Sequence, residues 1–425
     1  MKISRTAIKT ICLMLTFTAV LMLSGCTSYD NFRRTFIDKE TEDSNVIYVG
    51  VFEPESGQYK KVGKEEIKGI QLAHSMYSNV KGVRVELVRI DTESDTNTAK
   101  AAIESLIKLN PVAIIGSAEE ANSMIAAEEA KKAKIPMITP SASNPLITEN
   151  NPYAFRACIT YDQRGTGLAE YTIKELSARK VAIITIQNDS TQEKMRSAFK
   201  ARLRKEGKKS GPEVVLDESI GINEFNMVKL AKQIQKSGAE VVFSPIGLEK
   251  ADLLYQQIEK RNMTNIRFLG NQEWLTEDFL KMKENHPQIK ISFTSDNVLN
   301  SGGTAETGFT AETQRFLVKY ANRYGQRDIP TQNTVLGYDA YMLTINAINN
   351  ARSLKPTDIR DALADTKDLR CATGVFNFDR DGNPVRLLIC HGNTSRLQNT
   401  IKGYNLSQNG DLIRINGVHG RVFWL

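Results

Sequence analysis

Histidine, tryptophan and cysteine are scarce in this sequence, and each shortage counts against a class of function. Among 425 residues there are four histidines, two tryptophans and five cysteines. The histidines form no HExxH motif and the cysteines form no CxxC pair, so the spacings typical of zinc sites are absent. A GxSxG motif, which presents the nucleophile of many hydrolases, is also missing. We therefore expect no metal, no cofactor and no enzymatic activity.

Long apolar runs are missing as well, except for one of 13 residues near the start of the chain. This run, 11–23 (ICLMLTFTAVLML), is too short to span a bilayer comfortably. Lys2, Arg5 and Lys9 precede it, and a positively charged segment followed by a short apolar run is typical of a signal peptide. The sequence therefore predicts export.

The apolar run ends in the residues LSGC, which resemble the bacterial lipobox. This motif implies a lipoprotein signal peptide over 1–25 and a lipid attached to Cys26; the alternative is an ordinary signal peptide followed by a chance cysteine. Stable anchoring requires more than one acyl chain. Residues 26–45 are polar and lack apolar periodicity, so we expect a tether that holds the protein to the outer face of the cell membrane or to a periplasm-facing membrane.

A net negative charge is also lacking, since the formal charge is +7 and the isoelectric point is about 8.9. Removal of the signal peptide takes away three positive charges and leaves +4. Residues 193–209 carry a local net charge of +6, which leaves −2 for the remainder, and Met195, Ala198, Phe199 and Leu203 recur there at helical spacing. We expect this helix to pack one face and to send its basic residues into water, where they contact a permease or anionic lipid. The charge therefore gives no reason to expect a nucleic-acid partner.

Three cysteines remain beyond residue 26, namely Cys158, Cys371 and Cys390. The segment GVFNFDRDGNPVRLLI, with turn residues at 379–382, predicts a hairpin between the last two. A turn centred between residues 380 and 381 places Cys371 opposite Cys390, at a separation close to that of a disulfide. An exported chain permits such a bond, so we expect a Cys371–Cys390 disulfide, with two buried thiols as the alternative. Cys158 is expected in the core.

Short apolar runs alternate with amphipathic segments from residue 46 onward, which is typical of an α/β fold with parallel sheets covered on both faces. Two such series, before and after about residue 164, indicate two doubly wound lobes. The expected strands are 46–52, 83–90, 112–116, 136–139, 180–186, 240–245, 266–270 and 289–293. The expected helices are 64–77, 97–109, 119–133, 163–177, 192–206, 226–237, 249–261, 311–324 and 335–350.

Five segments together resemble the type I periplasmic binding proteins, specifically the leucine/isoleucine/valine-binding group of ABC-transporter receptors. They are VGVFEPESGQYKKVGKEEIKGIQLA (49–73), RIDTESDTNTAKAAIESLI (89–107), VAIIGSAEEANSMIAAEEAKKAKIPMITPSASNPLIT (112–148), YGQRDIPTQNTVLGYDAYMLTINAI (324–348) and DIRDALADTKDLRCATGVFNFDRDGNPV (358–385). The resemblance implies two Rossmann-like lobes joined by a hinge of three crossings. It assigns 46–164 plus 295–365 to the N-terminal lobe and 165–294 plus 366–425 to the C-terminal lobe. Ligand bound between the lobes closes the hinge, and the closed form docks onto a permease.

The resemblance also implies ligand contacts in the first lobe. The loop Ser141-Ala142-Ser143 matches residues that contact the carboxylate and the amino group of an amino-acid ligand in the family. Glu120 matches a small hydroxyl residue that helps to hold the carboxylate, so this chain departs from the pattern there. Glu119 and Glu120 at a helix N-terminus suit the helix dipole, but they repel an anionic ligand group if they face the cleft.

In the second lobe the departures are larger. The family's aromatic or acidic ligand residues match Ser190, Gly247 and Gln272, so the aromatic platform and the carboxylate that receives an ammonium group are both absent. Glu273 lies one residue further on and is a candidate substitute. Tyr59, in the loop after the first strand, is a candidate for the lost ring.

Two interpretations of the ligand site remain open. In the first, the cleft binds a cationic or neutral polar molecule met by Glu120, Gln272 and the 141–143 loop. In the second, the two glutamates are solvated residues of a helical first turn, and the contacts come from the neighbours Ser117, Asn122 and Ser123. The sequence thus predicts a solute receptor of an ABC importer, with a regulatory or sensor lipoprotein that acts through a protein partner as the alternative.

Overall fold

The computed structural model describes residues 46–425, with gaps at 207–210, 272–273, 275–276, 296–310, 326–327, 329, 386, 393–400, 403, 407–411, 415–421 and 425. The expected signal peptide, the lipidation site Cys26 and the tether lie outside the described residues. The chain forms two units, Met1–Val46 and Ile47–Leu425, and the second holds the architecture described below. Among the described helices, none is both long enough and apolar enough to cross a membrane.

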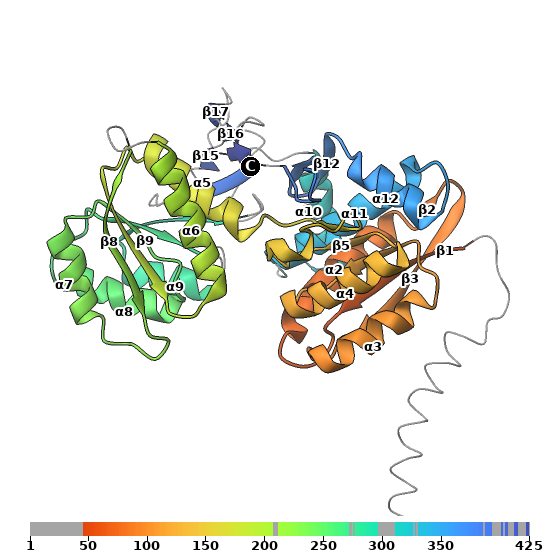
Figure 1. Cartoon of the computed structure of the whole chain (residues 1–425), viewed down its shortest axis with the longest axis horizontal. Coiled ribbons are helices and arrows are strands. Elements are labelled where there is room, and N and C mark those ends of the chain that lie inside the picture. Colours follow the sequence, from red (N-terminus) through yellow and green to blue (C-terminus); the bar gives the residue numbers. More distant parts are fainter. Residues whose placement is uncertain are drawn as a thin grey trace, which may run out of the picture. The chain divides into compact units, whose positions relative to one another are not determined.

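The first sheet has six strands in the order β2-β3-β1-β4-β5-β6, and β1, β4, β5 and β6 are parallel (Figure 1). Helices connect the parallel strands, as a parallel sheet requires. Its elements are β1 (Val46–Glu53), α2 (Lys60–Met76), β2 (Asn79–Val80), β3 (Val83–Asp91), α3 (Thr96–Ile107), β4 (Ala113–Gly116), α4 (Glu120–Ala133), β5 (Met137–Thr139), the 3₁₀ helix η1 (Pro145–Ile147) and β6 (Ala154–Arg156). Further along the chain come α10 (Ala311–Tyr324), α11 (Gln332–Asn350), α12 (Pro356–Ala364), β12 (Leu369–Cys371) and β13 (Gly374–Phe376).

The second sheet has eight strands, in the order β15-β14-β11-β10-β9-β7-β8 with β18 paired to β14. Strands β7 to β11 are parallel, and β14 joins them antiparallel. Its elements are α5 (Tyr161–Lys174), β7 (Lys180–Ile186), α6 (Ser190–Lys205), β8 (Glu213–Ile220), α7 (Met227–Ser237), β9 (Val241–Phe243), α8 (Leu248–Glu259), β10 (Arg267–Gly270), α9 (Glu277–Asn285), β11 (Lys290–Ser295), β14 (Leu387–Gly392), β15 (Ile401–Lys402) and β18 (Val422–Trp424). A separate hairpin pairs β16 (Tyr404–Leu406) with β17 (Leu412–Arg414).

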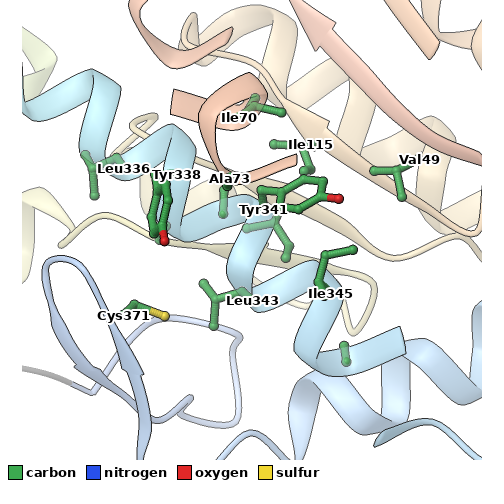
Figure 2. Close-up of a cluster of buried hydrophobic side chains, with 14 of the residues drawn as sticks. Val49, Ile70, Ala73, Ile115, Leu336, Tyr338, Tyr341, Leu343, Ile345 and Cys371 are labelled. Atoms are coloured by element: carbon green, nitrogen blue, oxygen red, sulfur yellow. The ribbon is translucent and has the colours of Figure 1, made fainter. Parts of the chain in front are cut away.

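Each sheet is covered on both faces because successive strand residues point to opposite sides. In the first sheet, Val49 and Ile115 enter a core shared with α2 and α11, part of which Figure 2 shows. Phe52 and Ile114 enter the other core, with α3 and α4. In the second sheet, β7 alternates in the same way between a core with α5 and α6 and a core with α7, α8 and α9. This is the doubly wound α/β fold that the sequence predicts.

All eight expected strands and all nine expected helices are present, with ends shifted by a few residues. The sequence missed short or partly exposed elements, including β6, β8, α9 and α12. Strand β6 has only three residues, and β8 lies at a sheet edge with most of its residues half-buried, so neither leaves a strong apolar signal. The expected boundaries between the lobes stay a prediction. Cys371, Ala372 and Phe376 lie in the core of the first sheet, whereas β14 belongs to the second sheet.

The predicted Cys371–Cys390 disulfide is wrong. Asp379–Asn383 does form the expected turn, with Phe378 paired to Pro384. The chain leaves this ladder on both sides, however, so that Cys371 lies opposite Gly374 in the β12–β13 pair and Cys390 lies opposite Thr294 in the β11–β14 pair. Cys371 is a buried thiol in the core of the first sheet (Figure 2). The register of a hairpin does not extend to residues whose strands pair elsewhere.

The basic helix α6 packs as predicted but uses its charges differently. Its buried positions include Met195, Phe199 and Leu203. The basic side chains are not simply solvated, because Arg202 pairs with the buried carboxylate of Glu170, and Arg196 donates to Asp217 at 2.8 Å. The sequence analysis placed these groups in water since their acidic partners lie on α5 and β8, distant in the chain.

Candidate functional site

The carboxyl ends of β1, β4 and β5 lie next to one another, because the three strands are parallel neighbours in the first sheet. In open α/β sheets, ligands bind outside the carboxyl ends of the strands. Residues 54–59, 117–119 and 140–144 follow these ends, and α2 and α4 begin beside them. We call this group of loops the strand-end site.

Ser117 makes several of the hydrogen bonds that hold the loop after β4. It is fully buried, and its carbonyl oxygen accepts hydrogen bonds from the hydroxyls of Ser123 at 2.7 Å and Thr139 at 2.9 Å. Its own N–H donates to Ser123 Oγ at 3.0 Å. Gly116 allows the chain to turn here, because its φ is +133° and an added Cβ would lie 2.0 Å from the carbonyl oxygen of Phe52. The loop is therefore held in one conformation by side chains of α4 and β5.

The serine loop, Ser141-Ala142-Ser143, is fixed from behind by Arg156 at the end of β6. The Arg156 guanidinium is fully buried and donates to the carbonyl of Ala142 at 3.0 Å and to that of Asn144 at 2.8 Å. Burial lowers the pKa of Arg156 from its usual value. Its hydrogen bonds turn the carbonyls of the loop inward. Arg156 therefore positions the loop, a role that the sequence analysis did not assign.

Two buried glutamates lie beneath the serine loop. Glu53 ends β1 and Glu66 lies on α2, and both side chains are fully buried. Their carboxyl groups hydrogen-bond to each other, which requires a proton on one of them. The Ser141 hydroxyl donates to Glu66, and Glu53 Oε2 accepts from the N–H of Ala118 at 2.8 Å. The pair thus joins the loops after β1, β4 and β5.

Burial is the main cause of the altered acidity of this pair. It raises the pKa of Glu66 to about 7, against the opposing effect of the hydrogen bonds from Glu53 and Ser141. It raises the pKa of Glu53 further, and the adjacent Glu66 carboxylate adds to that increase. Burial therefore favours retention of a proton by the pair, which the two carboxyl groups share.

Glu119 and Glu120, at the start of α4, are half-buried. Glu119 Oε2 accepts from Asn122 Nδ2 at 2.9 Å, and Glu120 Oε1 accepts from the Tyr161 hydroxyl at 2.5 Å. Burial, with a smaller contribution from Asp95, raises the pKa of Glu119. Both carboxylates are engaged by named partners at the strand-end site.

The loop after β1 is organised by Asp91 at the end of β3. Asp91 Oδ1 accepts from the N–H groups of Glu55 at 2.8 Å and Ser56 at 3.2 Å. Asp95 then caps α3 by accepting from the N–H of Asn97 at 2.9 Å. Tyr59 follows this loop and is 36% exposed, with its N–H donating to Ser94 Oγ at 3.0 Å. The contact of its ring with a ligand stays a prediction.

The structure brings together most of the expected contact residues. Ser117, Asn122, Ser123 and the serine loop share hydrogen-bond partners at the strand-end site. Ser190 is an exposed residue at the start of α6, and Gln272 lies outside the described residues. Four further residues of the site were not predicted from the sequence, namely Glu53, Glu66, Asp91 and Arg156. A glutamate directly after the apolar run of β1 is a signal that was available for Glu53.

Other features of the described residues offer no competing site. They contain no group of three or more histidine, cysteine, aspartate or glutamate side chains that could hold a metal ion. An open hollow of about 530 Å³ lies between the end of α2 and α10, lined by residues such as Met76, Tyr77 and Lys319. It lies at the end of α2 opposite to that beside the strand-end site, and none of its ionisable side chains is buried.

Comparison with known sequences gives two informative matches. Residues 46–388 match the profile of the family described as "Periplasmic binding protein". An "Amino acid binding protein" of Pseudomonas aeruginosa is 28% identical over 267 residues, which cover 61% of this chain and 70% of that protein.

Solved structures share the fold. The branched-chain amino acid transporter substrate-binding protein LivJ of Streptococcus pneumoniae, in complex with isoleucine, has a TM-score of 0.65 and 24% identity, over 81% of this chain and 95% of that one. A solute-binding protein of an ABC transporter from R. palustris, in complex with benzoate, has a TM-score of 0.64 and 20% identity, over 89% and 97%.

Proposed function

Because this chain belongs to the periplasmic binding protein family, we propose that it is a membrane-anchored extracytoplasmic receptor of an ABC importer. It binds a small polar, amino-acid-like solute between its two lobes and delivers that solute to a permease. The reaction is binding and release, with no bond made or broken, and the free energy of ligand binding drives hinge closure.

One observation carries the proposal: the polar residues of the strand-end site are buried and fixed in position by the protein's own hydrogen bonds. Ser117, Asn122 and Ser143 are each less than 5% exposed. Arg156 and the Glu53–Glu66 pair hold the loops that present them. A surface that acts only through a protein partner has no need of buried, preorganised polar groups, whereas a small-molecule site does.

Anchoring is proposed from the sequence. The residues LSGC at 23–26 supply a lipidation site, and 26–45 supply a polar tether that lets the binding unit reach a permease. The names of the related proteins support an amino acid or an aromatic acid as the chemical class of solute. The replaced positions Glu120 and Ser190 argue for a solute that differs from a free branched-chain amino acid.

The test combines ligand screening with a measurement of shape. The full-length protein, purified in detergent, is screened by thermal unfolding against amino acids, amines, amides and aromatic acids. A ligand at 100 times its Kd stabilises the protein by about 2.7 kcal/mol, a clear shift in Tm. X-ray scattering on the chain with and without the best compound then reports closure.

A receptor shows both a stabilising ligand and a smaller radius of gyration when that ligand is bound. The Ser143→Ala variant should lose the shift, and Ser105→Ala, at a half-buried position of α3 where the hydroxyl donates to the carbonyl of Ala101, should keep it. If no compound stabilises the protein and its shape never changes, the receptor proposal fails in favour of a regulatory or sensor lipoprotein of the same fold.

A further inference from the structure

We propose that the strand-end site recognises a hydrogen-bond donor that carries positive charge, such as an ammonium or amidinium group, in place of a ligand carboxylate. This inference rests on the proposed function and names the class of solute. It follows from where the protons of the site's own hydroxyl and amide groups point.

The hydroxyls of Ser141, Ser143 and Ser123 donate their protons within the protein. A serine hydroxyl has one proton to donate and two lone pairs to accept with. Ser141 donates its proton to Glu66, Ser143 donates to the carbonyl of Ser141 at 3.2 Å, and Ser123 donates to the carbonyl of Ser117 at 2.7 Å. Toward a ligand, these three hydroxyls therefore present lone pairs, which accept hydrogen bonds and do not donate them.

Two backbone amides just before α4 also donate within the protein. A helix N-terminus ordinarily offers N–H groups to an anion. Here the N–H of Ala118 donates to Glu53 Oε2 at 2.8 Å, and the N–H of Glu119 donates to Ser117 Oγ at 3.3 Å. Neither of these two amides is therefore available to a ligand carboxylate.

A buried acceptor in the same place has no partner among the described residues. Asn122 is fully buried, and its Nδ2 donates to Glu119, which leaves Oδ1 without a hydrogen bond. A buried polar atom without a partner is costly, so its presence indicates a group that arrives with the ligand. Because Oδ1 is an acceptor, that group must be a donor.

The charges around the site point the same way. Glu119 and Glu120 lie at the start of α4, and the Glu53–Glu66 pair with its one shared proton adds a negative charge beneath Ser141. The cation behind the loop, Arg156, directs its guanidinium at backbone carbonyls. Lys194 donates to Asn144 Oδ1 at 2.6 Å and is also engaged. A ligand carboxylate would meet acceptors and negative charge, whereas a cationic donor would meet complementary partners.

The experiment compares compounds that share a carbon skeleton and differ in charge. The full-length protein is titrated at pH 8 by calorimetry and thermal unfolding with benzamidine against benzoate and with 3-methylbutylamine against 4-methylpentanoate, and then with broader pools of amines and carboxylates. Where either compound of a matched pair binds, we expect the cation to bind at least tenfold more tightly than the carboxylate. Tighter or equal binding of the carboxylate would overturn the inference while leaving the receptor function intact. A protein that binds no compound of either pool would count against both.

A variant tests the role of the Ser141 proton. In Glu66→Gln the new amide can donate to Ser141 Oγ, so the hydroxyl proton is released for a ligand acceptor and the charge beneath the loop is lost. We expect cation affinity to fall at least tenfold and carboxylate affinity to rise. A merely destabilised variant would lose both, which would contradict the proposal. Glu128→Gln, a matched change at a side chain that is 59% exposed on α4, should leave both affinities unchanged.

Discussion

Arg156 Nη1 donates a hydrogen bond of 3.0 Å to the carbonyl oxygen of Ala142, across the 14 residues that separate the end of β6 from the serine loop. The same guanidinium donates to the carbonyl of Asn144 and to the Thr148 hydroxyl at 3.0 Å. One buried side chain thus sets the conformation of a loop that the resemblance to the family assigns to the ligand.

Replacement of Arg156 by methionine should therefore cost both stability and binding. The change leaves the carbonyls of Ala142 and Asn144 without donors, and each unsatisfied buried group costs about 1 to 3 kcal/mol. We expect the free energy of unfolding, measured by urea denaturation, to fall by about 3 kcal/mol, together with loss of ligand binding. Arg352→Met, at a side chain that is 80% exposed, is the matched control. Equal free energies of unfolding for the two variants would refute the role of Arg156 in holding the serine loop.

The raised pKa of Glu66 predicts that stability falls as pH rises. Below pH 4.5 the carboxyl is protonated in both the folded and the unfolded chain. Between pH 4.5 and about 7 the folded protein keeps the proton that the unfolded chain releases, so the slope of the unfolding free energy with pH is negative. Above pH 7 Glu66 is ionised in both the folded and the unfolded chain. The decrease in the free energy of unfolding has then reached its full size, on the order of 3 kcal/mol.

Chemical denaturation at several values between pH 5 and pH 8 measures this fall. Glu66→Gln should show a smaller decrease than the unmodified protein, because one of the two buried acids no longer titrates. Glu128→Gln should show the same decrease as the unmodified protein. If stability were constant or rose over this range in the unmodified chain, the assignment of the shared proton would be wrong.

Close packing of α2 on α11 predicts intolerance of a side chain at Gly69. An added Cβ would lie 1.8 Å from the carbonyl oxygen of Thr334, and the obstructing atoms belong to the backbone, which cannot move without shifting the helix. We expect Gly69→Ala to lower the free energy of unfolding by about 2 kcal/mol or more. At Gly247, which precedes α8, nothing lies within 4 Å of the added Cβ, so Gly247→Ala should have little effect. Both are measured as shifts in the urea midpoint.

Lipid anchoring predicts that Cys26 decides where the protein is found. In cells that produce Cys26→Ala, we expect the chain to leave the membrane fraction and to lose incorporation of labelled palmitate. Cys12→Ala, a change inside the apolar run, should leave both unchanged. Membrane association that survives Cys26→Ala would indicate a signal peptide without lipidation.

Much of the fold was predictable from sequence because it depends on local patterns. The near-continuous apolar residues of β1, β4 and β7, and the helical spacing of Met195, Phe199 and Leu203, identify strands buried on both faces and helices with one packed face. The serine loop was also placed by sequence directly after a strand, at the sheet edge where ligands of such folds bind, and its contact with a ligand stays a prediction.

Sequence by itself thus determined the fold class and the order of the predicted strands and helices, and it predicts the loops in which ligand contacts lie. Only the tertiary structure decided which atoms those loops present. Glu53 and Glu66 are 13 positions apart and lie 88 and 75 positions before Ser141, yet the Ser141 hydroxyl donates to Glu66, which in turn contacts Glu53. Hydrogen-bond direction and burial depend on contacts between distant segments. The strand partners of Cys371 and Cys390 depend on such contacts too, and a local turn pattern wrongly predicted that these two residues lie opposite each other.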